Sequence, residues 1–120
     1  MGDSDNWRNS KFYKMHNQNF QSCIDACLSC ASACEECASY CKRKPGMELC
    51  EKLCRDTLYA CRKCAEECKN MSNKAAKSAQ QCADTCYACA QECDKFHNEI
   101  CKKCAEECRK CEEECRKIAA

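Results

Sequence analysis

The chain has 120 residues, with 20 basic and 19 acidic side chains, and 20 of its residues are cysteine. Leu, Ile and Phe number ten in all and Val is absent, far below the ~20% of such residues that a conventional core requires. The length allows one domain. The composition excludes an ordinary aliphatic core and, because the chain lacks a basic excess, argues against a nucleic-acid partner.

The chain also lacks signals for a membrane or for export. No run approaches the ~18 consecutive apolar residues of a membrane-spanning helix, and the first residues, MGDSDNWRNSK, contain no apolar stretch of a secretory signal. We therefore expect no membrane association and a cytoplasmic protein. A mature exported form, expressed without its signal, would have the same features and remains the alternative.

Groups of cysteines separated by turn residues predict four helices in a single bundle spanning 1–120. After a flexible arm at 1–9, the first helix is expected at about 10–42 and the second at about 46–70. Pro45 and Gly46 mark the boundary, because proline disfavours helical geometry in the residue before it and glycine suits a helix exit.

The second half of the chain continues the pattern. The third helix is expected at about 73–95, with Ser72 or Asn73 as its N-cap. The fourth is expected at about 98–118, with Asn98 as its N-cap. Both helices are predicted to pack against the first two through their cysteines.

Within each group the cysteines recur at alternating intervals of three and four residues, as in CKKCAEECRKCEEEC from Cys101 onward. This spacing is typical of the apolar seam of a helix in a bundle. Thr57 occupies a seam position that lacks a thiol. Alanine is abundant and β-branched residues are few, which favours helix. The sequence therefore predicts an all-α fold, an antiparallel four-helix bundle with a cysteine-lined core.

Charged residues occupy the positions away from the cysteines and are expected to form a solvated exterior. On the last helix their spacing predicts three ion pairs between residues four apart: Glu106 with Lys110, Glu112 with Arg116, and Glu113 with Lys117.

Twenty inward thiols exceed what packing needs, because Ala, Leu or Val would fill the seams without the hazard of oxidation. A disulfide-bonded structural protein is one alternative, since small cysteine-dense chains are commonly stapled secreted domains. Residues three or four apart on a helix, however, have Cβ atoms about 5–6 Å apart, whereas a relaxed disulfide needs about 3.8 Å. Only bridges between helices would therefore be unstrained.

Metal binding uses many thiolates and suits seam sulfurs that converge on one ion. Charge ranks the metals, because uncompensated buried charge is costly. Zinc in four-thiolate sites would compensate about half of the thiolate charge, whereas one Cu(I) ion per thiolate leaves the core neutral. We predict storage and detoxification of many Cu(I) ions, roughly one per cysteine, with a metallothionein-like zinc or mixed-metal buffer as the alternative. The candidate ligands are Cys23, Cys27, Cys30, Cys34, Cys37, Cys41, Cys50, Cys54, Cys61, Cys64, Cys68, Cys82, Cys86, Cys89, Cys93, Cys101, Cys104, Cys108, Cys111 and Cys115.

Other cysteine chemistry fits the pattern less well. Iron–sulfur clusters use compact loop motifs, whereas the CxxC units here keep the helical spacing. A thioredoxin-like redox motif needs a strand–helix–strand context, and no strands are predicted. The chain has two glycines and therefore no phosphate-binding glycine loop, and it shows no Ser/His/Asp set. We expect that it is not an enzyme.

The cysteine-lined helices, and above all the closing segment CKKCAEECRKCEEECRKIAA, resemble the bacterial copper storage proteins, whose last helix has the similar form CxxCxxxCxxCxxxC. The resemblance covers about residues 10–120. It implies a four-helix bundle, assembled as a homotetramer, whose core cysteines hold many Cu(I) ions. We also expect copper ions as the partner, exchanged with a copper chaperone or an apo-copper enzyme. Thr57 departs from an unbroken thiol seam and is expected to leave a local gap in the metal array.

Residues that extend the seams beyond the cysteines indicate where copper reaches the core. In an antiparallel bundle Met47 and His97 lie at one end, beside Cys41 and Cys101, and His16 lies at the other. Thioether and neutral imidazole are weaker Cu(I) ligands than thiolate, which suits transient sites. We predict Met47, His97 and His16 as accessory ligands and favour the end that carries the first two. The alternative is that these side chains only close the bundle by packing.

Overall fold

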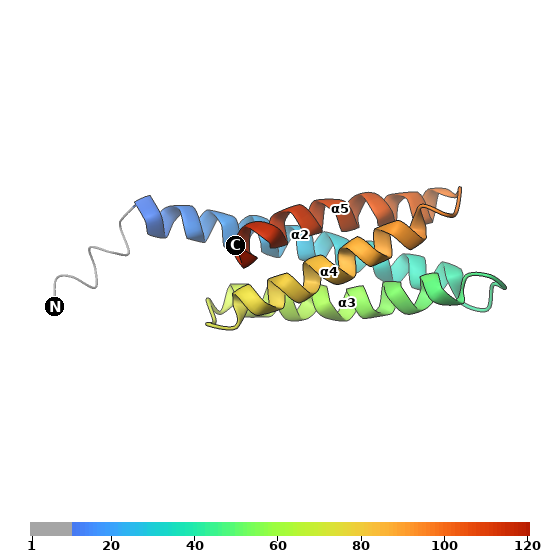
Figure 1. The fold of residues 1–120 in the computed structure, drawn as a ribbon, viewed down its shortest axis with the longest axis horizontal. Helices are drawn as coiled ribbons and strands as arrows, with labels where there is room; N and C mark the ends of the chain where they lie inside the picture. Colours follow the sequence, from blue (N-terminus) through green and yellow to red (C-terminus); the bar gives the residue numbers. More distant parts are fainter. Residues whose placement is uncertain (1–10) are drawn as a thin grey trace.

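A computed structural model describes the backbone of residues 11–120 and the side chains from residue 20 onward. The predicted arm at 1–9 and the side chain of His16 lie outside the described residues. The described part consists of helices joined by short turns and contains no strand (Figure 1), which confirms the predicted all-α class. The helices are α2 (Lys11–Cys41), α3 (Glu48–Lys69), α4 (Ala75–Cys93) and α5 (Glu99–Ala119).

Each helix packs beside two others around a common axis. Among the described residues, α2 and α4 each contact both α3 and α5, and the two diagonal pairs make no close backbone contact. Neighbouring helices run antiparallel: Cys27 of α2 contacts Cys115 of α5, whereas Cys37, further along α2, contacts Cys101. The four seams therefore face one axis.

The two ends of this bundle differ. One end, here called the Met47 end, is formed by the turns at 42–47 and 94–98. The other, the Ile118 end, is formed by the turn at 70–74 and the last residues of α5. None of the described helices combines the length and hydropathy that a membrane crossing requires.

The turn between α2 and α3 depends on two left-handed residues. Arg43 has φ 64° and Gly46 has φ 86°, and only glycine adopts the second value without a steric cost from Cβ. The N–H of Gly46 donates to the carboxylate of Glu48 at 2.8 Å. The chain thus leaves α2 at Cys41 and enters α3 within a few residues, which brings the ends of both seams together.

The predicted cap of α5 is confirmed, whereas that of α4 is wrong. The side-chain oxygen of Asn98 accepts a hydrogen bond from the N–H of Cys101 at 2.8 Å. Neither Ser72 nor Asn73 precedes α4 directly. The residue before α4 is Lys74, which already has near-helical φ −93° and ψ −3°. The Ser72 hydroxyl accepts from the Lys74 N–H within the turn instead.

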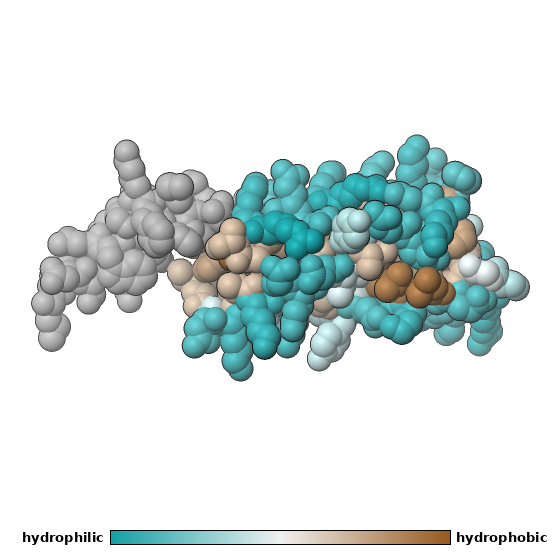
Figure 2. Space-filling view, viewed as in Figure 1, coloured by the Kyte–Doolittle hydropathy of each residue, from teal (hydrophilic) through white to brown (hydrophobic). Residues whose placement is uncertain are grey.

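Hydrophilic residues cover most of the face drawn in Figure 2, and apolar residues show in patches along its middle. Of the predicted ion pairs on α5, Glu112 with Arg116 is present at 2.8 Å. The other two were wrong, because each lysine contacts a half-buried glutamate three residues earlier instead: Lys110 with Glu107 and Lys117 with Glu114.

Candidate metal centre

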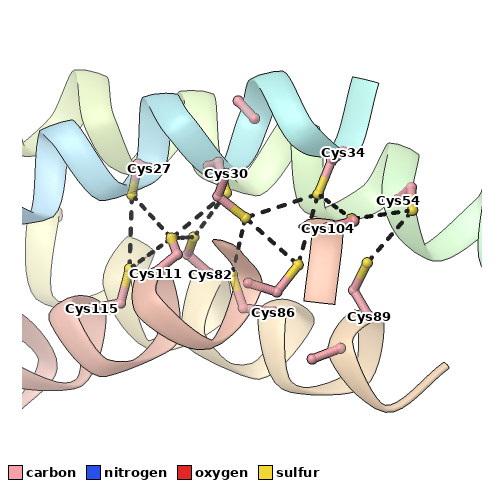
Figure 3. Packing of buried hydrophobic residues seen from close by; sticks show 14 of the residues in the cluster. Cys27, Cys30, Cys34, Cys54, Cys82, Cys86, Cys89, Cys104, Cys111 and Cys115 are labelled. Carbon is pink, nitrogen blue, oxygen red and sulfur yellow. Dashed lines mark hydrogen bonds between the residues drawn. The ribbon is translucent and has the colours of Figure 1, made fainter. Parts of the chain in front are cut away.

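All 20 cysteines are buried and none forms a disulfide. The structure therefore places every predicted ligand inside the bundle. Their sulfur atoms follow the axis between the four helices (Figure 3), and we call this arrangement the thiol column. The remaining buried hydrophobic residues of the same cluster are alanines and Met47. Small alanines allow the helices to approach closely, so that sulfurs from different helices meet.

Sulfurs from neighbouring and diagonal helices come into contact within the column. The Sγ atoms of Cys30 and Cys108 lie 3.6 Å apart, as do those of Cys61 and Cys82. Cys30 also lies 4.0 Å from Cys86, across the diagonal. These separations are about twice the ~2.05 Å of a disulfide. They suit a shared metal ion, because two sulfurs bonded to one ion at about 2.3 Å, as zinc is, are at most about 4.6 Å apart.

Sets of four sulfurs lie within 4.8 Å of one another along the column. All members of these sets are buried, and the three sets nearest the Ile118 end share cysteines with one another. Soft ions favour such thiolate ligands. The sets include Cys23/Cys27/Cys64/Cys115, Cys27/Cys82/Cys111/Cys115, Cys30/Cys61/Cys86/Cys111, Cys34/Cys89/Cys104/Cys108 and Cys37/Cys41/Cys50/Cys101.

Thr57 lies in the α3 seam and is fully buried. Its hydroxyl donates a hydrogen bond to the backbone carbonyl of Thr85 in α4 at 3.2 Å. The hydroxyl is therefore satisfied by the neighbouring helix. The seam position without a thiol was evident from the spacing, but nothing in the sequence indicated Thr85 as the partner.

The column is shorter on α4 than on the other helices. Ala75, Ser78 and Ala79 are buried in the first turns of α4, and its first thiol is Cys82. At the Ile118 end the thiols therefore come from α2, α3 and α5, and α4 contributes small residues. These α4 residues were not predicted as part of the core, although their spacing continues the seam.

Burial changes the proton affinity of the thiols. At the Met47 end, desolvation raises the pKa of Cys101 to about 12, although the hydrogen bond with Asn98 acts to lower it. Desolvation likewise raises the pKa of Cys41. Deeper in the column the thiols act on one another: the hydrogen bond with Cys108 lowers the pKa of Cys104 to about 6. A metal ion that binds a protonated thiol here must displace its proton.

The two predicted accessory residues at the Met47 end have different surroundings. Met47 is buried within the core cluster at the start of α3. His97 is exposed and lines a surface hollow of about 260 Å³. Cys93 also lines this hollow, together with Phe96 and Lys102. Cys41 and Cys101 were predicted to lie beside the accessory residues, whereas Cys93 was not, because the order of residues does not show where the surface is hollowed.

A model of the copper storage protein family matches residues 16–120 of the chain. The chain belongs to the copper storage protein family. The resemblance inferred from the cysteine spacing is thus confirmed. A search among curated proteins found no match.

Solved structures of copper storage proteins have the same fold. Copper-free copper storage protein 3 from Bacillus subtilis is 33% identical, with a TM-score of 0.79 over 83% of this chain and 98% of that one. A cytosolic copper storage protein from Streptomyces lividans, with five coppers, is 30% identical, with a TM-score of 0.84 over 88% and 96%. A Streptomyces lividans structure loaded with 10 copper equivalents is 32% identical, with a TM-score of 0.80 over 85% and 84%.

Proposed function

We propose that this copper storage protein holds Cu(I) along its thiol column, with all 20 cysteines as ligands and a capacity of roughly one ion per thiol. The observation that carries the proposal is the run of buried four-sulfur sets contributed by different helices. The protein sequesters metal for storage and detoxification and is not an enzyme. Solved relatives described as Cu(I)-bound and copper-loaded support this assignment.

The sharing of cysteines between sets favours a monovalent ion. Cys27 and Cys115 each belong to two of the sets, and so does Cys111. If each thiolate bridges two ions and each ion is bound by two thiolates, the core holds one ion per thiolate. With a monovalent ion, such a core is neutral. Isolated zinc sites would need four thiolates each, which leaves excess negative charge in the interior. A zinc or mixed-metal buffer is therefore the weaker alternative.

We further propose that copper reaches the column at the Met47 end, with His97 and Met47 as transient ligands. Two thiols at this end, Cys50 and Cys101, lie in the first turns of α3 and α5, where the helix dipole favours the thiolate and acts against the desolvation that raises the pKa of Cys101. The helices that begin on the side of the Ile118 end are α2 and α4, and neither carries a thiol in its first turns. His16 remains a candidate accessory ligand beyond that end.

The protein is proposed to work in the cytoplasm as a homotetramer that exchanges copper with a chaperone or an apo-copper enzyme. The Streptomyces lividans relative described as cytosolic supports the compartment. The tetramer rests on the family resemblance, and the exchange partners follow from the proposed storage of copper. Neither a nucleic acid nor a membrane is proposed as a partner.

The storage function is tested by anaerobic titration of the reduced protein with Cu(I) held by a strong chelator. We expect uptake to continue to about one ion per cysteine and an excess of zinc to displace little of the copper. A thiol count on freshly isolated protein, before and after metal removal, accompanies the titration. Saturation after a few ions, or equal competition by zinc, would contradict the proposal. Thiols that stay unreactive after metal removal would favour the disulfide alternative.

A further inference from the structure

The first turns of α4 and the facing side of α3 form a basic hollow toward the Ile118 end. This hollow of about 300 Å³, here called the lysine hollow, is lined by Lys63 of α3 and by Lys74, Lys77, Ser78 and Gln81. The three lysines are exposed, and none of them takes part in an ion pair with another described residue. Three uncompensated positive charges therefore surround one opening.

Two of these lysines lie where a helix disfavours positive charge. The N-terminus of a helix carries a partial positive charge, so acidic residues stabilise it and basic residues destabilise it. The first turn of α3 contains Glu48 and Glu51, whereas that of α4 contains no acidic residue and has no side-chain cap. Instead, Lys74 directly precedes α4 and Lys77 lies in its first turn. The helix dipole therefore adds to the positive field of the lysine hollow, at a cost to the stability of α4.

A free hydroxyl opens on the lysine hollow from an otherwise buried residue. Ser78 is 5% exposed and lines the hollow, and its hydroxyl has no hydrogen-bond partner among the described residues. The one fully enclosed side-chain oxygen without a partner in the described part of the chain is Oε2 of Glu67, which does not line the hollow. The Ser78 oxygen is thus not enclosed, and it is available to a molecule in the hollow.

We propose that the lysine hollow binds a phosphate group, either as inorganic phosphate or as a small phosphate monoester. A phosphate group brings up to about two negative charges and several acceptor oxygens. The lysines, the Ser78 hydroxyl and the Gln81 amide are matching donors. A carboxylate brings one charge and fewer oxygens. The hollow is at the small end of ligand pockets, and its lining has no aromatic side chain that would hold a nucleotide base.

Bound phosphate would link α3 to α4. Lys63 belongs to α3, whereas the other lining residues belong to α4 or directly precede it. One anion therefore neutralises charges that otherwise repel one another across the interface between these helices. No cysteine is among the lining residues, so phosphate does not compete with copper for thiols. The inference goes beyond the proposed function and does not depend on it.

Calorimetric titration of the reduced, copper-free chain with inorganic phosphate at low ionic strength tests the site. We expect saturable binding of one phosphate per chain, with competition by glycerol phosphate and none by sodium chloride of equal ionic strength. Either order of affinity for phosphate and glycerol phosphate supports the proposal and shows which source the site prefers. Binding that does not saturate, or equal competition by chloride, would overturn it.

Variants of the lining separate charge from hydrogen bonding. Lys74→Gln combined with Lys77→Gln should weaken phosphate binding at least about tenfold, because charge-assisted hydrogen bonds are lost. Ser78→Ala should weaken it by roughly fivefold without a change in its salt dependence, because no charge is removed. Unchanged affinity in the double variant or in Ser78→Ala would contradict the assigned site.

A second double variant with the same change in net charge provides the control. Lys42 and Lys103 are exposed and do not line the lysine hollow. Lys42→Gln combined with Lys103→Gln should therefore bind phosphate as the unchanged chain does. Equal weakening in the two double variants would show a response to net charge alone, and the proposal would fail.

Thermal unfolding of the copper-free protein gives an independent readout. Phosphate should raise the melting temperature of the unchanged chain more than that of the variant with Lys74→Gln and Lys77→Gln, because a ligand of the folded state stabilises it. This variant relieves the charge at the start of α4, so it should still fold. An equal rise in both would show that phosphate acts only as a stabilising salt, which would overturn the proposal. Because no copper is present, failure to store copper would count against the proposed function alone.

Discussion

A single side chain interrupts the thiol column. Thr57 is fully buried, and its hydroxyl donates a hydrogen bond to the Thr85 carbonyl. Threonine is close to cysteine in size, so the position has room for a sulfur. The hydroxyl at this position therefore limits the number of ligands while it helps to hold α3 against α4.

Replacing Thr57 separates these two roles. Thr57→Cys should raise the Cu(I) capacity by about one ion per chain, because it completes the seam. Thr57→Val, similar in shape, should leave the capacity unchanged. Both should lower the free energy of unfolding of the copper-free protein by about 0.5–1.5 kcal/mol, the typical contribution of one hydrogen bond. Copper titration and denaturant unfolding measure the two effects. Equal capacities in the two variants would contradict a ligand role for this position.

Thiol burial predicts a loss of stability at alkaline pH. Desolvation raises the pKa of Cys101 to about 12 and raises that of Cys41. The unfolded chain releases these protons from about pH 8.5 upward, whereas the folded chain retains them. The contribution of these two protonated thiols to the free energy of unfolding is therefore fully present below about pH 8.5. It is lost as the pH rises toward 12.

Thermal unfolding of the copper-free protein, followed by circular dichroism, should show a melting temperature that falls over this range. Cys101→Ser removes one of the titrating groups and should reduce the dependence. A melting temperature that stays constant from pH 8 to pH 11 would contradict the prediction.

At the scale of the helices, the start of α5 depends on one side-chain cap. Asn98 accepts a hydrogen bond from the N–H of Cys101, which fixes the first turn of the helix that carries the last five thiols. Asn98→Ala should lower the free energy of unfolding of the copper-free protein by about 1 kcal/mol, as is typical for loss of an N-cap. Denaturant unfolding measures this. Asn73→Ala serves as the control, since Asn73 is exposed and does not cap α4.

The ion pairs on the helix surfaces contribute little to the stability of the fold. Lys110 and Lys117 contact half-buried glutamates three residues earlier, Glu107 and Glu114. All these lysines are largely exposed, so such pairs contribute little to stability. The stability of the helices comes from their buried seams, which explains why the fold tolerates ion pairs other than those predicted.

At the scale of the whole molecule, the difference between the two bundle ends gives copper a direction of access. His97→Ala should slow Cu(I) loading from a chelator without a change in final capacity, because His97 lines the hollow that reaches Cys93. Met71→Leu, at the Ile118 end, is the matched control and should change neither quantity. Stopped-flow measurement of chelator absorbance follows the loading. Equal rates for the two variants would argue against access at the Met47 end.

Much of this arrangement follows from local regularities in the chain. Alternating steps of three and four residues place cysteines on one face of any α-helix, so the seams, the helical class and the interior position of all 20 thiols were predictable. The cap at Asn98 depends on a bond three residues away and was predictable for the same reason. The cap of α4 was not predictable, because Lys74, the residue directly before this helix, already has near-helical backbone geometry.

The sequence by itself therefore determined the type of core, its charge balance and the kind of ion that it suits. Only the tertiary structure decided which sulfurs meet, that Thr57 bonds to Thr85, and that Cys93 lies beside both a surface hollow and Cys50. These features depend on the axial offset between antiparallel helices, which the turns and the packing of alanines set. Helical periodicity specifies the face of a residue, and it does not specify the height at which that residue meets the next helix.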